Sequence, residues 1–417
     1  MVGAASMLII GCSPRAPVKM AHSNLQRDVN PNVAVDDVST LVDGNDAFAF
    51  NLYQSLKAGT GNVVFSPYSI SLALAMTYAG ARNETESQMA EALNFTLPQE
   101  RLHPAFNKLD LALLQERQPQ SNGGQALQLD IANAVWAEQS FAFLQPFLNL
   151  LARNYGSGLK LADFVNQPAA VRNEINQWVS DQTHEEVKDL IPQGAIDTLT
   201  RLVVVNAIYF KADWEDQFDP TDTKDESFHL VDGSTIRVKM MSENINGAQF
   251  STGDGYKAVE LNYLEKTAAM DILVPDEGKF NDFESQLDAT KYNDILAGMQ
   301  PKMLSLGLPK FSYTQNSDLG DHLSSLGMSD AFDPTLADFS GMSGGRDLFI
   351  SKVQHQAFVA VDEKGTEAAA ATSVIMQATS ILLPGETLTI DRPFIFVIRD
   401  VASKQILFIG RVLNPNN

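Results

Sequence analysis

The chain has very little cysteine and no concentration of positive charge. Cys12 is the single cysteine among 417 residues, so no internal disulfide is available to stabilise the fold. The formal net charge is −21, and lysine and arginine form no cluster anywhere in the sequence. Because nucleic-acid binding depends on a basic face that neutralises phosphates, the composition argues against that class of function.

The sequence motifs of metal and phosphate chemistry are also missing. No two histidines stand at metal-ligand spacing, and His184-Glu185-Glu186 does not complete the H-E-x-x-H pattern of zinc proteases. The histidines are His22, His103, His184, His229, His322 and His355. No glycine-rich phosphate loop is present either. We therefore expect no metal site and no cofactor.

One segment matches an enzyme motif by its letters. Residues 341–345 read Gly-Met-Ser-Gly-Gly, which fits the G-x-S-x-G pattern of a nucleophilic serine. That motif needs a strand before it and a helix after it. Here the polar stretch Asp333–Thr335 precedes it and the strand-like stretch Leu348–Ile350 follows it. We interpret the segment as a Gly/Ser loop and do not expect an enzyme.

The N-terminus allows two interpretations. The short apolar run Met7–Gly11 ends at Cys12 and cannot span a bilayer. It resembles the end of a bacterial lipoprotein signal, whose cysteine is lipidated after cleavage. No lysine or arginine precedes the run, as a secretory signal would have, so a chance apolar N-terminus is the alternative. The first interpretation predicts an extracytoplasmic protein, secreted or lipid-anchored to the cell envelope, with a signal over residues 1–12.

The remaining chain has the composition of a globular protein, since 44% of its residues are hydrophobic and 19% are charged. Residues 13–42 mix proline, asparagine and aspartate without periodicity, which predicts a flexible spacer. From there to Pro415 no repeat and no break in composition divides the sequence, so we expect one domain over residues 43–417. Asn45 or Asp46 is the expected cap of its first helix.

Two segments predict buried elements with polar residues inside them. A short strand over Val63–Phe65 leads to Ser66, a favourable N-cap, and to Pro67, a favourable first residue of a helix. The nearly continuous apolar run Leu202–Trp214 suits a strand buried on both faces. Asn206 interrupts that run and needs hydrogen-bond partners.

A long segment between two predicted strands has the side-chain pattern of a strand itself. Strand-like residues occur over Leu348–Val361 and again over Leu388–Ile398, and a loop of this length without a helix is uncommon. In the segment between them, the even positions from 366 to 378 are all uncharged and small or apolar. These are Thr366, Ala368, Ala370, Thr372, Val374, Met376 and Ala378. Because strand side chains alternate between faces, the segment is able to enter a sheet with one face buried. An alanine-rich linker is the alternative.

The residues Glu363–Ala370, with the sequence Glu-Lys-Gly-Thr-Glu-Ala-Ala-Ala, resemble the proximal hinge of the serpins, which are serine protease inhibitors. The resemblance extends over nearly all of the region from Asp43 to Pro415 and includes the stretches at Asn206–Trp214 and Leu388–Ile398. It implies an α+β serpin fold with three β-sheets, eight or nine helices and a metastable native state. The exposed reactive-centre loop would then span residues 363–390.

The resemblance also assigns roles to individual residues. The hinge residues it implies are Glu363, Gly365, Thr366, Ala368, Ala369, Ala370 and Ala371. The residues it places at the shutter, where the central strands part, are Ser66, Ser69, Asn206 and His355. Trp214 is expected at the breach, where the loop first enters the sheet.

The function that follows from the resemblance is suicide inhibition by a bacterial-type serpin. A target serine protease, or as a second class a cysteine protease, forms a covalent acyl-enzyme with the loop, which then inserts into the central sheet. The inhibitor is expected to be a monomer. The predicted helix His103–Gln118 holds only Lys108 and Arg117 as cations, so activation by glycosaminoglycans is not expected. A non-inhibitory serpin that acts as a carrier or interaction module is the alternative.

The usual serpin spacing places the reactive bond between Thr379 and Ser380. The segment from Ser380 to Arg392 is about three residues longer than is typical of the family, which leaves Leu382–Leu383 and Met376–Gln377 open. No lysine or arginine lies between Gly365 and Asp391, so a trypsin-like target is disfavoured. The small residues Ala378 and Thr379 suit elastase-like or subtilisin-like proteases.

Overall fold

The computed structural model describes residues 18–116, 127–366 and 385–417. Two β-sheets and ten α-helices form this part of the chain. None of its helices combines the length and the apolar character that crossing a bilayer requires.

The first helix starts earlier than the sequence predicted. Helix α1 (Val35–Leu56) begins at Val35, and Asn45 and Asp46 lie buried in its interior instead of capping it. Tertiary partners satisfy the Asn45 amide, which donates to the Gln405 side chain at 2.8 Å and accepts from the Ser71 hydroxyl at 2.7 Å. A polar residue that we took for a helix start is therefore part of a buried hydrogen-bond network.

The predicted spacer over residues 13–42 is wrong for its described part. Strand β1 (Met20–Ala21) pairs with β4 (Leu159–Ala162) at the edge of the first sheet. Arg27 forms an ion pair with Asp110 at 2.8 Å. This segment lacks a hydrophobic period, yet backbone pairing and one arginine attach it to the domain.

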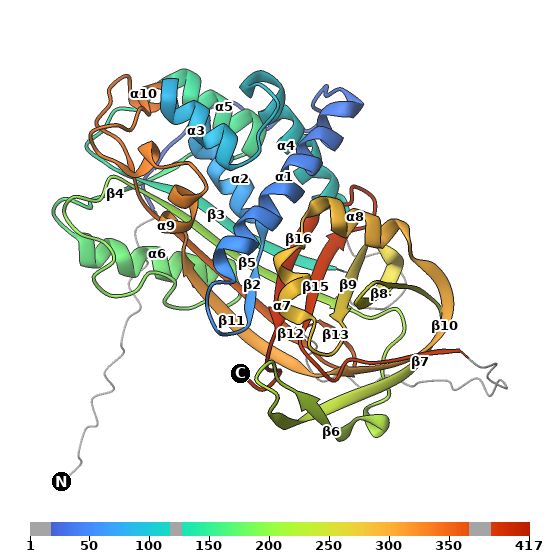
Figure 1. The fold of residues 1–417 in the computed structure, drawn as a ribbon. Helices are drawn as coiled ribbons and strands as arrows, with labels where there is room; N and C mark the ends of the chain where they lie inside the picture. The colour runs from blue at the N-terminus through green and yellow to red at the C-terminus, as the bar shows by residue number, and fades with distance from the viewer. Residues whose placement is uncertain (1–17, 117–126, 367–384) are drawn as a thin grey trace, which may run out of the picture.

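The first sheet has seven strands and contains the strand that the apolar run predicted. Its order is β1, β4, β3 (Gln128–Glu138), β5 (Leu202–Asp213), β13 (Gly365–Thr366), β12 (Ile350–Val361) and β11 (Phe311–Asp318). Helix α6 (Pro168–Gln182) covers one face, and α1 and α2 (Pro67–Tyr78) lie on the other (Figure 1). Alternate residues of β5 enter two different hydrophobic clusters, with Val203 and Val205 facing α6 and Val204 and Ile208 facing the main core. The prediction of a strand buried on both faces is confirmed.

The second sheet has nine strands and merges two of the three sheets that we expected. The strands are β2 (Val63–Phe65), β6 (Lys224–His229), β7 (Thr235–Gly253), β8 (Tyr256–Asn262), β9 (Ala268–Pro275), β10 (Gln300–Pro309), β14 (Glu386–Thr389), β15 (Phe394–Asp400) and β16 (Ile406–Val412). The long strand β7 pairs with β6 and β10 along most of its length and with β8 at its end. β7 therefore joins by hydrogen bonds the strands of the two sheets that we expected to be separate.

The stretch Leu388–Ile398 is two strands rather than the one that we predicted. Strand β14 ends at Thr389 and pairs with β10, whereas β15 begins at Phe394 and pairs with β9 and β16. Pro393 immediately precedes β15, and a proline cannot donate to a strand ladder. The break lets the chain leave one edge of the second sheet and return to its interior.

The other helices lie around these sheets, and several are short. They are α3 (Asn83–Ala92), α4 (Gln99–Glu116), α5 (Gln145–Tyr155), α7 (Phe280–Ser285), α8 (Ala289–Ala297), α9 (Gly320–Ser325) and α10 (Ser340–Ser343). Ser66 caps α2 as predicted, because its side chain accepts a hydrogen bond from the backbone N–H of Ser69 at 3.2 Å. Pro67 is the first residue of that helix.

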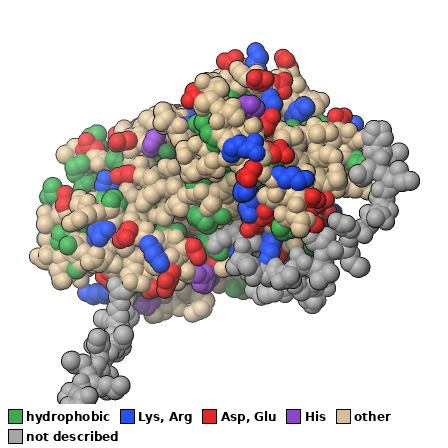
Figure 2. Space-filling model, turned by 90° about the horizontal axis from the view of Figure 1, so that it is seen from below, with side chains coloured by type: hydrophobic (Ala, Val, Ile, Leu, Met, Phe, Trp, Pro, Cys, Tyr) green, Lys and Arg blue, Asp and Glu red, His purple; other side chains and the backbone are tan. Residues whose placement is uncertain are grey.

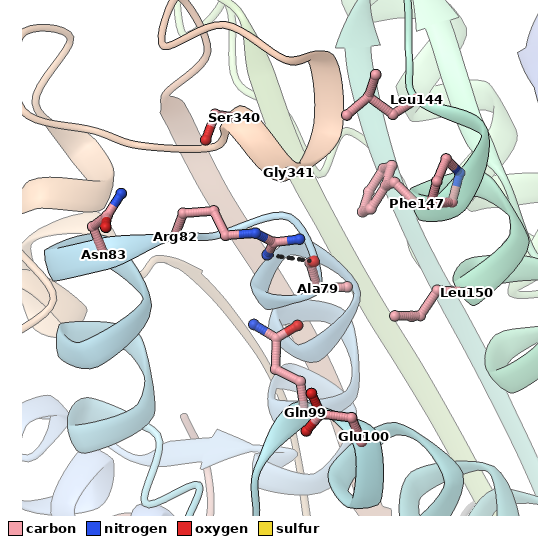
Figure 3. Close-up of a pocket in the computed structure, with 11 residues that line it drawn as sticks. Ala79, Arg82, Asn83, Gln99, Glu100, Leu144, Phe147, Leu150, Ser340 and Gly341 are labelled. Carbon is pink, nitrogen blue, oxygen red and sulfur yellow. Dashed lines mark hydrogen bonds between the residues drawn. The ribbon is translucent and has the colours of Figure 1, made fainter.

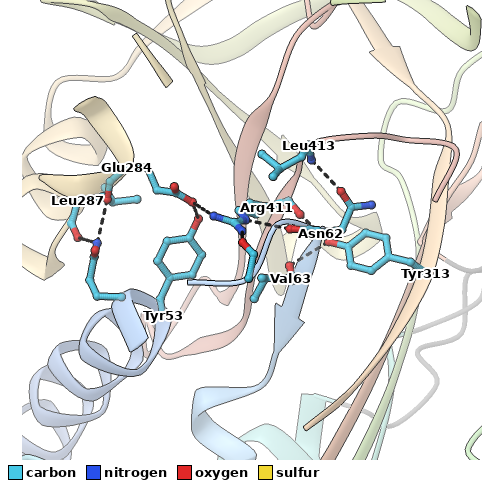
Figure 4. Close-up of polar contacts among 11 residues, drawn as sticks. Tyr53, Asn62, Val63, Glu284, Leu287, Tyr313, Arg411 and Leu413 are labelled. Atoms are coloured by element: carbon cyan, nitrogen blue, oxygen red, sulfur yellow. Dashed lines mark hydrogen bonds and ion pairs between the residues drawn. The ribbon is translucent and has the colours of Figure 1, made fainter. Parts of the chain in front are cut away.

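A buried charge network ties the C-terminal strand β16 to α1 and α7 (Figure 4). The Arg411 guanidinium contacts the Glu284 carboxylate at 2.9 Å, and the Tyr53 hydroxyl donates to the same carboxylate at 2.7 Å. The Tyr313 hydroxyl donates to the carbonyls of Val63 and Arg411 at 3.0 and 3.1 Å. Burial, with the Glu284 charge as the next cause, raises the pKa of Tyr53 well above its usual value, so this phenol remains a donor.

Replacing Glu284 with glutamine should lower the free energy of unfolding by about 3–5 kcal/mol, because Arg411 is left as a buried charge without a counter-ion. Denaturant titration of the purified variant measures the change. Asp282→Asn on the exposed side of the same helix is the matched control and should lie within about 0.5 kcal/mol of the wild type. Equal free energies of unfolding of the two variants would contradict the role of Glu284 as the buried counter-ion of Arg411.

Candidate functional site

The central feature of the first sheet is a seam between the parallel strands β5 and β12. Direct pairing runs from Leu202 with Ile350 to Ile208 with Ala357. Beyond that point the two strands separate, and the two-residue strand β13 lies between them, paired with Ala212 and Asp213 on one side and with Val361 on the other. β5 and β12 are therefore paired directly over most of the seam. At one end they are separated by the width of one strand, and β13 occupies that space.

The predicted hinge residues Gly365 and Thr366 form this inserted strand. A Cβ atom on Gly365 would lie 2.1 Å from the carbonyl oxygen of Ala212, so only glycine fits the close approach to β5. Thr366 is 1% exposed, and its hydroxyl lies 2.6 Å from that of Tyr263. The start of the loop segment is thus already a buried part of the sheet.

Trp214, the predicted breach residue, holds the turn that leads into the hinge. Its indole N–H donates to the Asp362 carbonyl at 3.0 Å, and its backbone N–H donates to the Lys364 carbonyl at 2.7 Å. Its ring stacks on Tyr263 with the centroids 4.5 Å apart. Burial raises the pKa of the Tyr263 phenol above its usual value, so the hydroxyl next to Thr366 stays protonated. Tyr263 lies just beyond the end of β8, and no sequence pattern marks it as part of the site.

Glu363 anchors the same turn from its outer side. Its carboxylate contacts the Lys310 ammonium at 2.5 Å and accepts a hydrogen bond from the Thr223 hydroxyl at 2.8 Å. Burial pushes the pKa of Glu363 upward, but the hydrogen bonds from Lys310 and Thr223 outweigh it and leave the pKa below its usual value. The residue is therefore ionised at neutral pH and fixes the hinge turn to Lys310, between β10 and β11, and to Thr223, just before β6.

The structure brings the four predicted shutter residues together beneath the closed part of the seam. His355 and Asn206 are direct neighbours across β12 and β5, and His355 Nδ1 is hydrogen-bonded to Asn206 Oδ1. His355 Nε2 accepts from the backbone N–H of Ser66 at 3.2 Å, and the Asn206 amide donates to the Ser69 hydroxyl. These contacts connect the start of α2 to both strands of the seam.

The protonation state of His355 follows from these partners. Its Nε2 faces an N–H donor, so this nitrogen must carry a lone pair and the ring must be neutral. Burial in the protein lowers the pKa of His355 to about 3, in agreement with that geometry. The seam is thus held by an uncharged histidine.

Asn133 on β3 is a further member of this cluster that our sequence analysis did not identify. Its amide donates to the Ser69 carbonyl at 3.1 Å, and its oxygen accepts from the Ser69 hydroxyl at 3.3 Å and from the Asn206 amide. The available signal was a polar residue within an apolar strand, which is the same signal that Asn206 gives. The cluster therefore spans three strands and one helix.

Several predicted residues lie outside the described part of the chain. They are Cys12, Ala368, Ala369, Ala370, Ala371, Thr379 and Ser380. Within that part, no group of three or more His, Cys, Asp or Glu side chains is arranged to hold a metal ion. The first three residues of the G-x-S-x-G segment, 341–343, lie in the single helical turn α10 (Ser340–Ser343), which no strand immediately precedes, so the context of a nucleophilic serine is not met.

A sheet with a one-strand opening that is filled by the start of a long loop agrees with the family expected from the hinge. The model of the serpin (serine protease inhibitor) family matches residues 43–415. The chain belongs to the serpin family. It has the serpin fold, and as a member of a family of protease inhibitors it is not an enzyme.

Serpin relatives occur in animals and in archaea. Leukocyte elastase inhibitor A of Mus musculus is 38% identical over 385 residues, which is 90% of this chain and 99% of the relative. An uncharacterised serpin-like protein of Thermococcus kodakarensis is 37% identical over 379 residues, or 90% and 86% of the two chains.

Two solved structures show the same architecture. The thermophilic serpin tengpin in its native state superposes with a TM-score of 0.82 at 29% identity and covers 94% of this chain and 97% of its own. Human thyroxine-binding globulin superposes with a TM-score of 0.81 at 32% identity, over 91% of this chain and all of its own.

Proposed function

We propose that this serpin is an inhibitor of serine proteases that acts as a suicide substrate. The observation that carries the proposal is the position of Gly365 and Thr366, which already form a strand between β5 and β12. A loop severed further along is able to extend this strand down the seam. The small and apolar even positions that follow in the sequence place no charge or proline in its way.

The driving force is strand addition. The protease forms an acyl-enzyme with the loop, and cleavage frees the N-terminal limb. Inserting that limb gains on the order of ten ladder hydrogen bonds at about 1 kcal/mol each, plus apolar burial. A gain near 10 kcal/mol is comparable to the stability of a whole domain, about 5–15 kcal/mol. Insertion therefore supplies enough free energy to distort the attached protease, and the intact inhibitor is kinetically trapped above its inserted state.

The local contacts define what insertion must break. β5 and β12 have to separate along the register from Ile208 to Leu202, and the His355–Asn206 hydrogen bond crosses that line. Helix α6 packs over β3 and β5 on the same sheet. These contacts account for a barrier that keeps the uncut protein closed.

Cleaving the reactive-centre loop should raise the melting temperature by more than about 10 °C, since a gain of roughly 10 kcal/mol shifts a domain of this size by that amount. Differential scanning calorimetry before and after limited proteolysis measures the change. An unchanged melting temperature would contradict the inhibitor and favour the alternative, a non-inhibitory carrier or interaction module.

We propose elastase-like or subtilisin-like proteases as the targets, with Thr379–Ser380 as the reactive bond. The absence of lysine and arginine between Gly365 and Asp391 supports this choice, as does the similarity to leukocyte elastase inhibitors. Mass spectrometry of the C-terminal peptide released by elastase identifies the bond. A peptide that begins at Gln377 or Leu383 would move it to one of the other two positions.

Activation by a polyanion remains unexpected in this proposal. Helix α4 begins at Gln99 and so includes Arg101, but that arginine forms an ion pair with Asp37. On the face shown in Figure 2, acidic side chains are interspersed with the basic ones, including where several basic side chains lie close together right of the centre. We propose a monomer that meets its protease without a glycosaminoglycan.

We propose further that Cys12 carries a lipid and anchors the protein outside the cytoplasm. The support is the apolar run that ends at this cysteine. Metabolic labelling with a fatty acid should mark the wild type and leave Cys12→Ser unlabelled. An unlabelled, fully soluble wild type would refute the anchor and leave the inhibitor proposal intact.

A further inference from the structure

A cavity of 590 Å³ lies between the end of α2, the starts of α4 and α5, and the turn at Ser340 and Gly341 (Figure 3). The Arg82 guanidinium lies on one side of it, and the side chains of Leu144, Phe147 and Leu150 lie on the other. The cavity thus combines one fixed positive charge with one apolar wall.

The Arg82 guanidinium is held in place by hydrogen bonds from only one of its nitrogens. Its Nη1 donates to the carbonyls of Ala79 and Ala81 at 3.1 and 2.5 Å. A Cβ atom on Gly341 would lie 2.5 Å from its Cζ, so the backbone of the turn packs directly against the group. Among residues 18–116, 127–366 and 385–417, no carboxylate lies within 4.0 Å of Arg82, and neither Nε nor Nη2 has a hydrogen-bond acceptor. Two parallel donors of a guanidinium are the geometry that binds a carboxylate.

The apolar wall comes from the start of α5. Leu144, Phe147 and Leu150 are spaced three residues apart, which places them along one side of the helix. Leu144 is 40% exposed although it is a large hydrophobic residue. It is also the N-cap of α5 and provides no side-chain hydrogen bond there, so the partial positive charge of this helix end adds to that of Arg82.

We propose that this cavity binds an amphipathic monocarboxylate. The carboxylate accepts hydrogen bonds from Nε and Nη2 of Arg82, and an aliphatic or aromatic body packs along Leu144, Phe147 and Leu150. Glu100 is exposed at the rim of the cavity and disfavours ligands with more than one negative charge. An inorganic anion would leave the apolar wall uncovered.

Isothermal titration calorimetry with decanoate tests the proposal, with decanol as the neutral comparison. Decanoate should bind at least about tenfold more tightly than decanol, because only the acid pairs with the guanidinium. Arg82→Gln should abolish that preference, and Glu100→Gln should strengthen decanoate binding severalfold. Equal affinities for the acid and the alcohol, or no binding of decanoate by the wild type, would overturn the proposal.

A second pair of variants keeps the test valid if Arg82→Gln fails to fold. Leu144→Asp supplies the missing N-cap of α5 and should fold well, but it places a carboxylate opposite Arg82 and should weaken decanoate binding at least about tenfold. Leu144→Asn provides the same cap and loses the same apolar contact without adding a charge, so it should bind decanoate at least about tenfold more tightly than Leu144→Asp. Equal decanoate binding by these two variants would show that the carboxylate does not lie at Arg82.

Discussion

Replacing Thr366 with arginine is expected to turn the proposed inhibitor into a substrate that the protease cuts and releases. Thr366 is buried between β5 and β12, and its hydroxyl lies against that of Tyr263, whose ring stacks on Trp214. Burying an unpaired charge costs several kcal/mol, so the hinge strand leaves the sheet and insertion cannot begin. Since each 1.4 kcal/mol slows a step about tenfold, hydrolysis of the acyl-enzyme should outrun insertion by about a hundredfold or more. The measurement is the number of inhibitor molecules consumed per protease inactivated.

Two comparisons separate this effect from general damage. Thr366→Ser keeps the hydroxyl and should inhibit as the wild type does. Ala368→Arg changes the next even position of the sequence and should also give a substrate. If either arginine variant still forms stable covalent complexes in full yield, insertion from this hinge is not the inhibitory step.

Replacing His355 with alanine should lower the free energy of unfolding by about 3–5 kcal/mol. The change leaves the Ser66 N–H and the Asn206 carbonyl buried without their partners, and each such loss costs about 1–3 kcal/mol. His229→Ala on the surface is the control, which should lie within about 0.5 kcal/mol of the wild type. A loss of similar size in both variants would contradict a role of His355 in closing the seam.

The burial of His355 also predicts that the free energy of unfolding depends on pH. The pKa of His355 is about 3 in the folded protein and about 6.5 in the unfolded chain. Below pH 6.5 only the unfolded chain takes up the proton, so the contribution of His355 is complete above that pH and falls by about 1.4 kcal/mol per pH unit below it. His103, whose pKa burial lowers to about 3, acts in the same direction. Asp46 acts in the opposite direction below pH 8, since burial raises its pKa to about 8.

Because these contributions overlap, the difference between the wild type and His355→Ala isolates the histidine. Denaturant titrations at pH 6.5 and pH 5 measure the free energy of unfolding of each protein. Between these two pH values, the free energy of unfolding of the variant should fall by about 2 kcal/mol less than that of the wild type. Parallel losses in both proteins would mean that His355 titrates normally in the folded state.

The parts of the fold that the sequence predicted are those in which local pattern and burial agree. The apolar run of β5 is buried on both faces, because a continuous hydrophobic segment of this length is stable only when both of its faces are covered. Ser66 and Pro67 begin α2, because both residue types favour the start of a helix. The start of α1 at Val35 and the pairing of β1 with β4 were missed, since their stability comes from contacts distant in sequence.

The residues of the site could be predicted where a polar side chain interrupts an apolar strand and therefore needs buried hydrogen-bond partners. Asn206 was noticed because an amide in an apolar strand must find partners, and Asn133 offered the same signal. Tyr263 offered none, because a tyrosine after a strand is common and only its stacking on Trp214 and its contact with Thr366 distinguish it. The register that places the hinge between two parallel strands is a tertiary property that no local pattern contains.

The most direct test of the account is a denaturing gel of the purified protein after incubation with neutrophil elastase. Insertion of the loop down the seam predicts a new band, heavier than either partner, that survives boiling in detergent because the acyl bond is trapped. Clipped inhibitor alone, with no heavier band for elastase or for any other serine protease tried, would contradict the account.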